Sequence, residues 1–533
     1  MEDNSNSKSP LKVSTMTNDQ VEAADAFGVG EVTFATDGTE LPSKAQEAEF
    51  AAILNDAINH RRLRPSQIQF AAIAGSIGAA LFVAIGSGVL SGPLCLLLGF
   101  IFWASVVFCV AQCQTEIITL FPLDGSFIRL AGRMVDPALG VAVGWNYFFC
   151  QTSYVMFEAT VINTLVEYWG YNQSPAILIS DLFGEAELML GGNPLHDRFG
   201  FRYWKDPGFW AGSNPSARLE SFINAINVAG FCIGGPEYIS IIAGEARDPR
   251  RTMPRAFSSL MFRLLVFFIG GSFCVGVLIP YNDKTLTDGS NTYAGGSPYV
   301  ISMERLQIPI LPSIVNAGLI TTIISGGNAY TFGASRSLHA LALDGQAPKF
   351  LRRLNKKGVP YMAVIVVLLL GCLAYLSVSA GTAKVVNWIL NFCTAATMFN
   401  WTVMSFTWIR FNAAIKAQGI DRNSFLPKVS KYQPLAGYWA LFWAFLFLWV
   451  QGYAVFTKGN WEVSTFIFNY GIIAFAGAIG IVWKVVKRTR FYRSTEVDLR
   501  SGLELFDVLT EHYQQERENV PSSLKERIID KLF

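Results

Sequence analysis

The sequence predicts an all-α polytopic membrane protein with about ten transmembrane helices. Of its 533 residues, 51% are hydrophobic and only 15% are charged, and the mean hydropathy is +0.34. This composition excludes a single water-soluble domain. Most apolar residues lie in uncharged runs long enough for the roughly 20 residues that a helix needs to cross a lipid bilayer. Lys and Arg side chains concentrate in alternate loops between these runs, which is typical of a membrane topology.

Ten candidate spans follow one another along the chain. Residues 65–115 contain no charged side chain, and this segment is long enough for two helices separated by a Gly-containing turn at residues 88–93. The remaining spans, in order, are residues 137–157, 221–243, 264–282, 307–335, 358–383, 385–409, 432–457 and 463–483. Only the span at residues 221–243 includes a carboxylate in its interior, that of Glu237.

The basic residues predict the orientation of these spans. The loops at residues 247–263, 336–357 and 410–431 hold five, six and five Lys or Arg residues, whereas the alternate loops hold two, one and one. Because short loops rich in Lys and Arg stay in the cytosol, we expect both termini to be cytosolic. Residues 158–220 are then expected on the outer side.

Three regions are predicted along the chain. Residues 1–62 include ten acidic residues in the first fifty and no apolar core, which indicates a disordered acidic cytosolic tail. Residues 63–490 form the transmembrane domain. Residues 491–533 form a cytosolic C-terminal tail with a short predicted helix at residues 521–533.

Several classes of function are disfavoured. A net charge of +2 offers no basic excess for nucleic acid. The eight Cys residues lie inside apolar runs and the four His residues are scattered, so no cofactor, metal site or catalytic group of an intramembrane enzyme is expected. The lipid bilayer is the one partner that composition alone predicts.

Two spans contain glycine clusters in their middle, at residues 75–78 (Gly-Ser-Ile-Gly) and 234–237 (Gly-Gly-Pro-Glu). Unwound backbone at membrane depth occurs where it is buried or lines a cavity. The N–H groups of a restarted helix suit a carboxylate, and the carbonyls of the other half suit an ammonium group. Paired breaks are typical of the binding site of a secondary transporter. Close helix packing is the alternative for either cluster alone.

Glu237 is a candidate functional group, because an ionisable residue at this depth is costly. It can serve as a proton carrier or as a partner of a substrate amine, and a helix-capping role is the alternative. Glu158 lies about 30 Å along its helix from Pro137, near the outer interface unless the helix is long and tilted. Four Asn residues are candidates either for the transport path or for hydrogen bonds between helices: Asn328, Asn387, Asn391 and Asn400.

Five groups of motifs give the chain a recognisable resemblance. They occupy residues 74–78, residues 136–140 with 144–147, residues 235–240 continuing to 251, residues 334–338 with 346–349, and residues 417–422. Over residues 63–503, the chain resembles fungal amino acid permeases of the amino acid/polyamine/organocation superfamily. The general and dicarboxylic amino acid permeases are the most similar group.

The resemblance implies twelve helices, a five-plus-five inverted repeat with broken helices 1 and 6, and proton-coupled amino acid uptake at the plasma membrane. By the family motif, the backbone at Ser76, Ile77 and Gly78 would meet the substrate carboxylate. The second break would meet the amine and side chain through Phe231, Cys232, Gly234, Gly235 and Glu237. Glu237 would also take the coupling proton, with Glu158 as a second candidate.

The chain departs from the family pattern at two places. Ala79 and Ala80 stand where the family has Thr-Gly, which alters the substrate-binding segment. Residues 172–192 hold the flanks of helices 4 and 5 but not their apolar bodies, which leaves ten spans where the family has twelve. Coding sequence skipped at both places explains this, since the flanking motifs are intact; a degenerate paralogue is the alternative.

Other functions stay open at this point. A non-transporting nutrient sensor or an inactive truncated permease is consistent with the absent helices. The same fold could instead take a polyamine, a choline-like cation or a γ-amino acid as cargo. The side chains of the pocket decide the cargo, and the sequence alone does not place them.

Overall fold

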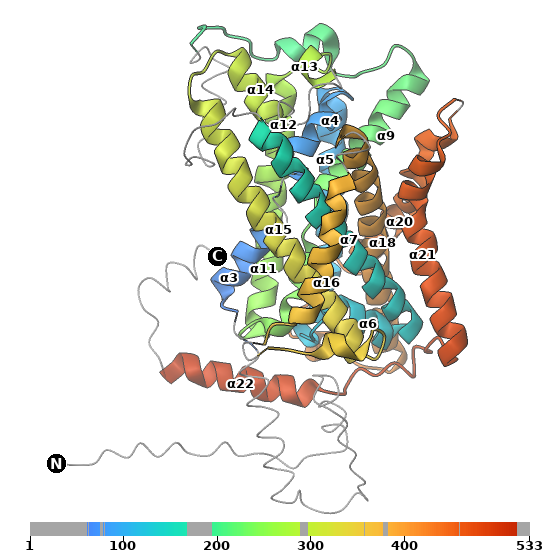
Figure 1. The fold of residues 1–533 in the computed structure, drawn as a ribbon. Coiled ribbons are helices and arrows are strands. Elements are labelled where there is room, and N and C mark those ends of the chain that lie inside the picture. The colour runs from blue at the N-terminus through green and yellow to red at the C-terminus, as the bar shows by residue number, and fades with distance from the viewer. Residues whose placement is uncertain are drawn as a thin grey trace, which may run out of the picture.

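The computed structural model describes residues 61, 63–74, 78, 80–167, 194–287, 297–355, 358–376, 382–457 and 459–519. The acidic tail predicted at residues 1–62, apart from Arg61, lies outside these ranges, as do the segment at residues 172–192 and the helix predicted at residues 521–533. Within them the fold is helical, and the isolated β-bridge found there joins Leu63 to Ala246. Figure 1 shows long helices standing side by side.

The chain enters the bundle through three short helical segments. Helix α3 (Pro65–Ala74) is followed by the π-helical turn η1 (Ala80–Ala84) and by α4 (Ile85–Val89). Gly92 then turns the backbone with φ of +98°, a conformation that favours glycine. Pro93 begins α5 (Pro93–Leu120) at the first helical position, where its missing N–H costs nothing.

The next helices cross the bundle at its centre. A short amphipathic helix α6 (Ser126–Met134) precedes α7 (Pro137–Glu167). The turn η2 (Trp204–Gly208) leads to α9 (Pro215–Cys232), whose first turn is capped by the Asn214 side chain accepting from the Ala217 amide at 2.9 Å. After a break come α10 (Pro236–Ile241) and the turn η3 (Ala243–Glu245).

A continuous helical rod then runs through α11 (Pro249–Arg263), η4 (Leu264–Gly270) and α12 (Gly271–Leu278). The five Arg residues expected in a loop here therefore lie next to or on this helix. The remaining elements in order are α13 (Lys284–Thr287), α14 (Pro298–Arg305), α15 (Leu311–Leu343), η5 (Lys349–Arg352), α16 (Tyr361–Gly371), η6 (Cys372–Leu376), α18 (Thr382–Ala417), α19 (Arg422–Phe425), α20 (Leu435–Val450), η7 (Tyr453–Phe456), α21 (Val463–Lys487) and α22 (Leu503–Asn519).

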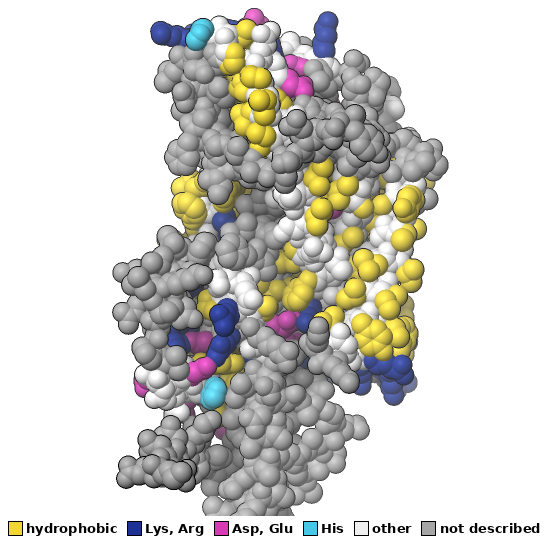
Figure 2. Space-filling view, turned by 60° about the vertical axis from the view of Figure 1, so that its left-hand side comes forward, with side chains coloured by type: hydrophobic (Ala, Val, Ile, Leu, Met, Phe, Trp, Pro, Cys, Tyr) yellow, Lys and Arg dark blue, Asp and Glu magenta, His cyan; other side chains and the backbone are white. Residues whose placement is uncertain are grey.

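The described parts of the predicted apolar runs lie mainly on these helices. Among the described residues, four helical segments are long and apolar enough to cross a membrane by length and composition: Pro93–Leu120, Pro249–Leu278, Leu435–Phe456 and Val463–Lys487. The other runs are shorter or more polar, so the count of ten spans stays a prediction. Figure 2 shows hydrophobic side chains over the middle of one face and a group of Lys and Arg at the lower end of the described helices.

The core is built around α7, which packs against α15, α18, α21 and α6. Helix α5 packs against α9, α20 and α11. Large aromatic side chains fill the space between these helices, and Trp103, Trp401 and Trp408 are among the largest fully buried ones. Because α7 and α18 are held on several sides, they form a rigid frame for the broken helices.

A layer of ion pairs closes the predicted cytosolic end, and we call it the inner layer. It consists of Glu116 with Arg422, Asp136 with Lys484, Glu245 with Arg336, and Asp344 with Arg129. Helix α22, which the sequence did not predict, lies across this end of the bundle (Figure 1). Three further ion pairs attach it: Arg247 with Glu516, Arg250 with Asp507, and Arg517 with Asp248.

Candidate functional site

The second glycine cluster interrupts a helix, as predicted. Helix α9 ends at Cys232, and Ile233 is extended with φ of −87° and ψ of 126°. Gly235 has φ of +147°, and a Cβ there would lie 2.7 Å from the Leu260 side chain, so only glycine fits. Pro236 begins α10 at the first helical position. The sequence Gly-Gly-Pro therefore ends one helix and starts the next within four residues.

Gly78, the described residue of the first glycine cluster, lies close to the end of α9. Helix α3 is described to Ala74 and η1 from Ala80, and of the residues between them only Gly78 is described. The Cys232 thiol donates to the Ala80 carbonyl at 3.1 Å, which joins the end of α9 to the start of η1. Of the residues predicted to bind the substrate carboxylate, Gly78 is buried at this junction, while Ser76, Ile77 and Ala79 lie outside the described residues.

Glu158 lies at the same junction, buried between helices. Its side chain is only 2% exposed, and its carboxylate is so close to Gly78 that a Cβ there would collide with it. The Tyr330 hydroxyl would lie 3.2 Å from that Cβ. The earlier placement of Glu158 counted only the apolar run, whereas α7 continues for 31 residues to Glu167. A helix of this length, about 46 Å, exceeds the hydrocarbon thickness.

Aromatic rings surround the end of α9. The Tyr154 ring stacks on Phe231 and on Tyr330, with centroids 5.3 and 4.8 Å apart. The Tyr154 hydroxyl donates to the Phe231 carbonyl at 3.2 Å, which satisfies one carbonyl left free by the helix end. Phe157 packs edge-on against Phe231 at 4.9 Å.

Glu237 is 7% exposed and accepts hydrogen bonds from neutral donors. The Trp401 indole N–H donates to its Oε2 at 2.9 Å, and the Gly235 amide donates to its Oε1 at 3.3 Å. In the described part of the chain, no Lys or Arg lies within ion-pair distance of Glu237. Beside it, the Tyr238 hydroxyl donates to the Ala329 carbonyl of α15.

A second buried carboxylate, Glu116, provides an internal reference. It is fully buried, and the Trp408 indole N–H donates to its Oε2 at 2.9 Å. Its Oε1 accepts from the Ser430 amide at 2.7 Å and pairs with the Arg422 guanidinium. The carboxylates of Glu116 and Glu237 therefore both accept from indoles on α18, but only Glu116 also forms an ion pair.

Sequence reasoning missed the aromatic residues of the site. Trp401, Tyr154 and Tyr330 lie inside apolar spans, where an aromatic residue is more often simply core. No local pattern distinguishes them, because their partners are distant in the sequence.

The four Asn candidates separate into three environments. Asn400 accepts from the Asn146 amide at 2.9 Å and so links α18 to α7. Asn328 is exposed on α15. Asn387 and Asn391 line a polar pocket near the outer end of α18.

The helical bundle, its apolar segments and the break between α9 and α10 are typical of multi-pass membrane transport proteins. Comparison with known proteins gives the family: a sequence model described as "Amino acid permease" matches residues 67–181 and 176–495. The chain belongs to the amino acid permease family.

Several yeast and fungal permeases are similar over most of the chain. The general amino acid permease AGP2 of Saccharomyces cerevisiae is 35% identical, with 83% of this chain and 82% of that protein covered. The dicarboxylic amino acid permease of the same yeast is 32% identical, covering 84% and 80%. A proline-specific permease of Emericella nidulans is 33% identical, covering 88% and 92%.

The alignments also show how many aligned positions have no counterpart in this chain. Because the alignment with AGP2 runs over 491 positions and 83% of 533 residues is about 442, roughly 50 positions have no counterpart here, which is close to two helices of about 20 residues. The two segments matched by the family model meet at residues 176–181, inside the segment where helices 4 and 5 were expected.

Proposed function

We propose that this protein is a secondary active transporter that imports an amino acid across the plasma membrane by proton symport. The observation that supports this most is Glu237, a buried carboxylate held by the Trp401 indole and a backbone amide at the break between α9 and α10. A carboxylate buried without a cation is costly in its charged form. Glu237 can therefore take up and release a proton as its surroundings change.

The substrate would lie between the two breaks. Backbone amides around residues 76–78 would bind its carboxylate, and the carbonyls at the end of α9 would bind its ammonium group. Tyr154 now donates to the Phe231 carbonyl, so the incoming ammonium group would displace this hydroxyl. Glu158, against Gly78, would supply a second carboxylate to the same space.

The proposal is tested by uptake of radiolabelled amino acids in cells that express the full chain, at external pH 5 and pH 7. We expect faster uptake at pH 5 and loss of this pH dependence in Glu237→Gln, because the amide has a similar shape and keeps one of the two accepted hydrogen bonds but does not titrate. Glu304→Gln, which changes an exposed carboxylate on α14, is the matched control and should behave as wild type. Proton-coupled uptake in Glu237→Gln would assign the proton to another group.

A non-transporting sensor or inactive truncated permease is the second candidate. The shortage of roughly 50 aligned positions favours it, because this length corresponds to about two helices. Substrate binding by the purified chain without uptake would support this candidate. Competition by a polyamine, a choline-like cation or a γ-amino acid would identify a different cargo.

A further inference from the structure

The C-terminal part of the described chain crosses the predicted cytosolic end of the bundle from one side to the other. After α21 ends at Lys487, the chain runs through residues 488–502 and continues as α22 (Figure 1). We call residues 491–519 the C-terminal strap. Its two parts contact two different groups of helices.

The first part of the strap is attached to the rigid frame. The Tyr492 amide donates to the Val135 carbonyl at 2.9 Å, two residues before α7 begins. Gln418, directly after α18, donates to the Val497 carbonyl at 2.7 Å. Since α7 and α18 each pack against several helices, this part of the strap keeps its place when other elements move.

The second part, α22, is attached to the elements next to the second break. The Arg61 guanidinium donates to the Pro122 carbonyl at 2.8 Å and to the Ala243 and Ala246 carbonyls at 3.3 and 3.4 Å. It also lies over the Phe506 ring of α22, 5.8 Å from the ring centroid. One side chain therefore joins α22 to the start of the bundle and to the turn that follows α10.

The attachment of α22 combines apolar burial with exposed ion pairs. Four of its side chains are at most 3% exposed: Leu505, Phe506, Leu509 and Tyr513. Ordering the 17 residues of α22 costs entropy that offsets much of the gain from this burial. The Arg247 and Glu516 side chains are 40% and 39% exposed, and Asp507 is 58% exposed, so each ion pair adds little. Release of α22 therefore costs less than disruption of the packed bundle.

A backbone bridge lies among the residues that α22 contacts. The Leu63 amide donates to the Glu245 carbonyl at 3.0 Å, and the Arg247 amide donates to the Leu63 carbonyl at 2.9 Å. These bonds join the start of α3 to the segment after α10. Because Arg61 and Arg247 flank the bridge and both contact α22, the position of α22 controls whether the bridge can open.

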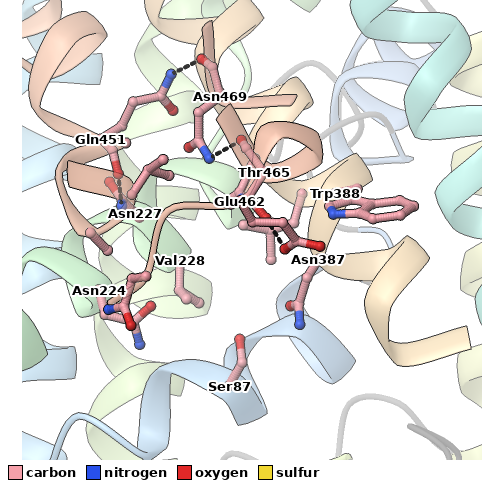
Figure 3. A pocket seen from close by; sticks show the side chains of 16 residues that line it. Ser87, Asn224, Asn227, Val228, Asn387, Trp388, Gln451, Glu462, Thr465 and Asn469 are labelled. Carbon is pink, nitrogen blue, oxygen red and sulfur yellow. Dashed lines mark hydrogen bonds between the residues drawn. The ribbon is translucent and has the colours of Figure 1, made fainter. Parts of the chain in front are cut away.

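The outer end of the bundle is held differently. Asn227 on α9 donates to the Gln451 carbonyl at 2.7 Å, and Gln451 donates to the Asn469 carbonyl of α21 at 3.0 Å (Figure 3). These bonds run directly from one helix to the next beside a pocket of about 430 Å³. An opening at the inner end, in contrast, also has to move α22.

We propose that the C-terminal strap holds the inner end of the protein closed and that α22 has to detach before this end opens. Movement of α3 and α10 relative to the frame separates the two attached parts of the strap, and the weaker attachment, that of α22, is the one that breaks. The effect of the strap on uptake rests on the proposed transport function, whereas closure of the inner end does not.

The first test measures hydrogen–deuterium exchange of the Leu63 and Arg247 amides in the purified full chain. Asp507→Asn combined with Glu516→Gln removes two ion pairs of α22. We expect about fivefold faster exchange at both amides, because exchange follows the population of the open form. Asp197→Asn, which removes an exposed ion pair in the predicted outer segment, is the control and should leave both rates unchanged. Wild-type exchange in the double variant would overturn the proposal.

The second test locks the strap in place. Arg250→Cys with Asp507→Cys replaces an ion pair by two thiols, which a short bifunctional methanethiosulfonate joins through disulfide bonds. We expect uptake into proteoliposomes to fall at least about tenfold and to return after reduction, since the inner end cannot open. The wild-type chain treated with the same reagent controls for its own cysteines. Full uptake by the joined chain would show that α22 need not detach. If the wild-type chain itself takes up no amino acid, the proposed function fails, and the exchange rates alone decide whether the strap closes the inner end.

Discussion

Glu116 and Glu237 are two buried carboxylates with a common partner and different surroundings. Each accepts from the indole N–H of a tryptophan on α18, Trp408 for Glu116 and Trp401 for Glu237, and both distances are 2.9 Å. Glu116 also pairs with Arg422, as other acids of the inner layer pair with Arg or Lys. Glu237 has neutral donors instead.

This difference distinguishes the structural role of Glu116 from the functional role proposed for Glu237. A buried carboxylate with a guanidinium keeps its ionised form, and the pair holds two segments together. A buried carboxylate with neutral donors is stable only while its hydrogen bonds compensate its desolvation. The inner layer therefore stabilises one arrangement of the helices, whereas Glu237 is the carboxylate that we propose to change its protonation.

The largest expected effect comes from removing the cation of the inner layer. Arg422→Met leaves Glu116 buried without its charged partner, at a cost of about 3–5 kcal/mol. We expect a strongly lowered Tm and a smaller monodisperse fraction in detergent. Lys431→Met removes a nearby exposed cation and serves as the control. If Arg422→Met melts like wild type, the pair does not stabilise the fold.

The next effect concerns the site at the breaks. Gly78→Ala places a methyl group against the Glu158 carboxylate and 3.2 Å from the Tyr330 hydroxyl. We expect uptake to fall at least tenfold while Tm changes little, because one side chain must move within the site. Gly477→Ala on α21 has open space around the new methyl group and should leave uptake unchanged. Normal uptake in Gly78→Ala would exclude this junction as the substrate site.

A paired substitution compares the two indoles directly. Trp408→Phe removes a hydrogen bond to a charged group, worth about 1.5–3 kcal/mol, and should lower Tm. Trp401→Phe removes the same donor from Glu237 and should change the pH dependence of uptake more than it lowers Tm. Melting curves and uptake at pH 5 and pH 7 distinguish the two. Identical behaviour of both variants would contradict the division between structural and functional charge.

The smallest effect is electrostatic and lies in the inner layer. Burial alone raises the pKa of Asp136, but hydrogen bonds from Lys484, the Ala138 amide and Thr489 outweigh it and lower this pKa below its ordinary value. The resulting stabilisation is present above the unfolded pKa of about 3.9 and is lost as pH falls through the lower folded value. Asp136→Asn should therefore melt about 2 °C below wild type at pH 6. The two Tm values should converge below about pH 4, and a constant difference would contradict this origin.

The sequence predicted the helices well because hydropathy and glycine clusters act locally. Gly234, Gly235 and Pro236 end one helix and begin another whatever surrounds them, so the second break was predictable. Helix α22 was not predicted, because its amphipathic face is stabilised by contacts with distant elements. The five Arg residues after the second break were assigned to a loop, but four of them, Arg250, Arg251, Arg255 and Arg263, lie on helix α11.

Of the candidate site, the sequence predicted the motifs that shape the backbone but not the side chains that surround them. The motifs identify Glu237 and the two breaks, but its partner Trp401 lies 164 positions away in the sequence. Glu158 was placed near the membrane surface from the length of its apolar run, and only packing brings it to Gly78. Side chains that meet across helices are set by tertiary contacts, which a single sequence does not encode in any local pattern.

Helix α18 runs without interruption from Thr382 to Ala417, and the two of its indoles that donate to the buried carboxylates, Trp401 and Trp408, are seven residues apart. Seven residues return nearly to the same angular position on an α-helix and advance about 10 Å. The Trp401 and Trp408 side chains therefore project from nearly the same face of one helix. A tilt of α18 that withdraws one indole from its carboxylate also displaces the other indole. The two buried carboxylates are therefore linked through α18, although they do not contact each other.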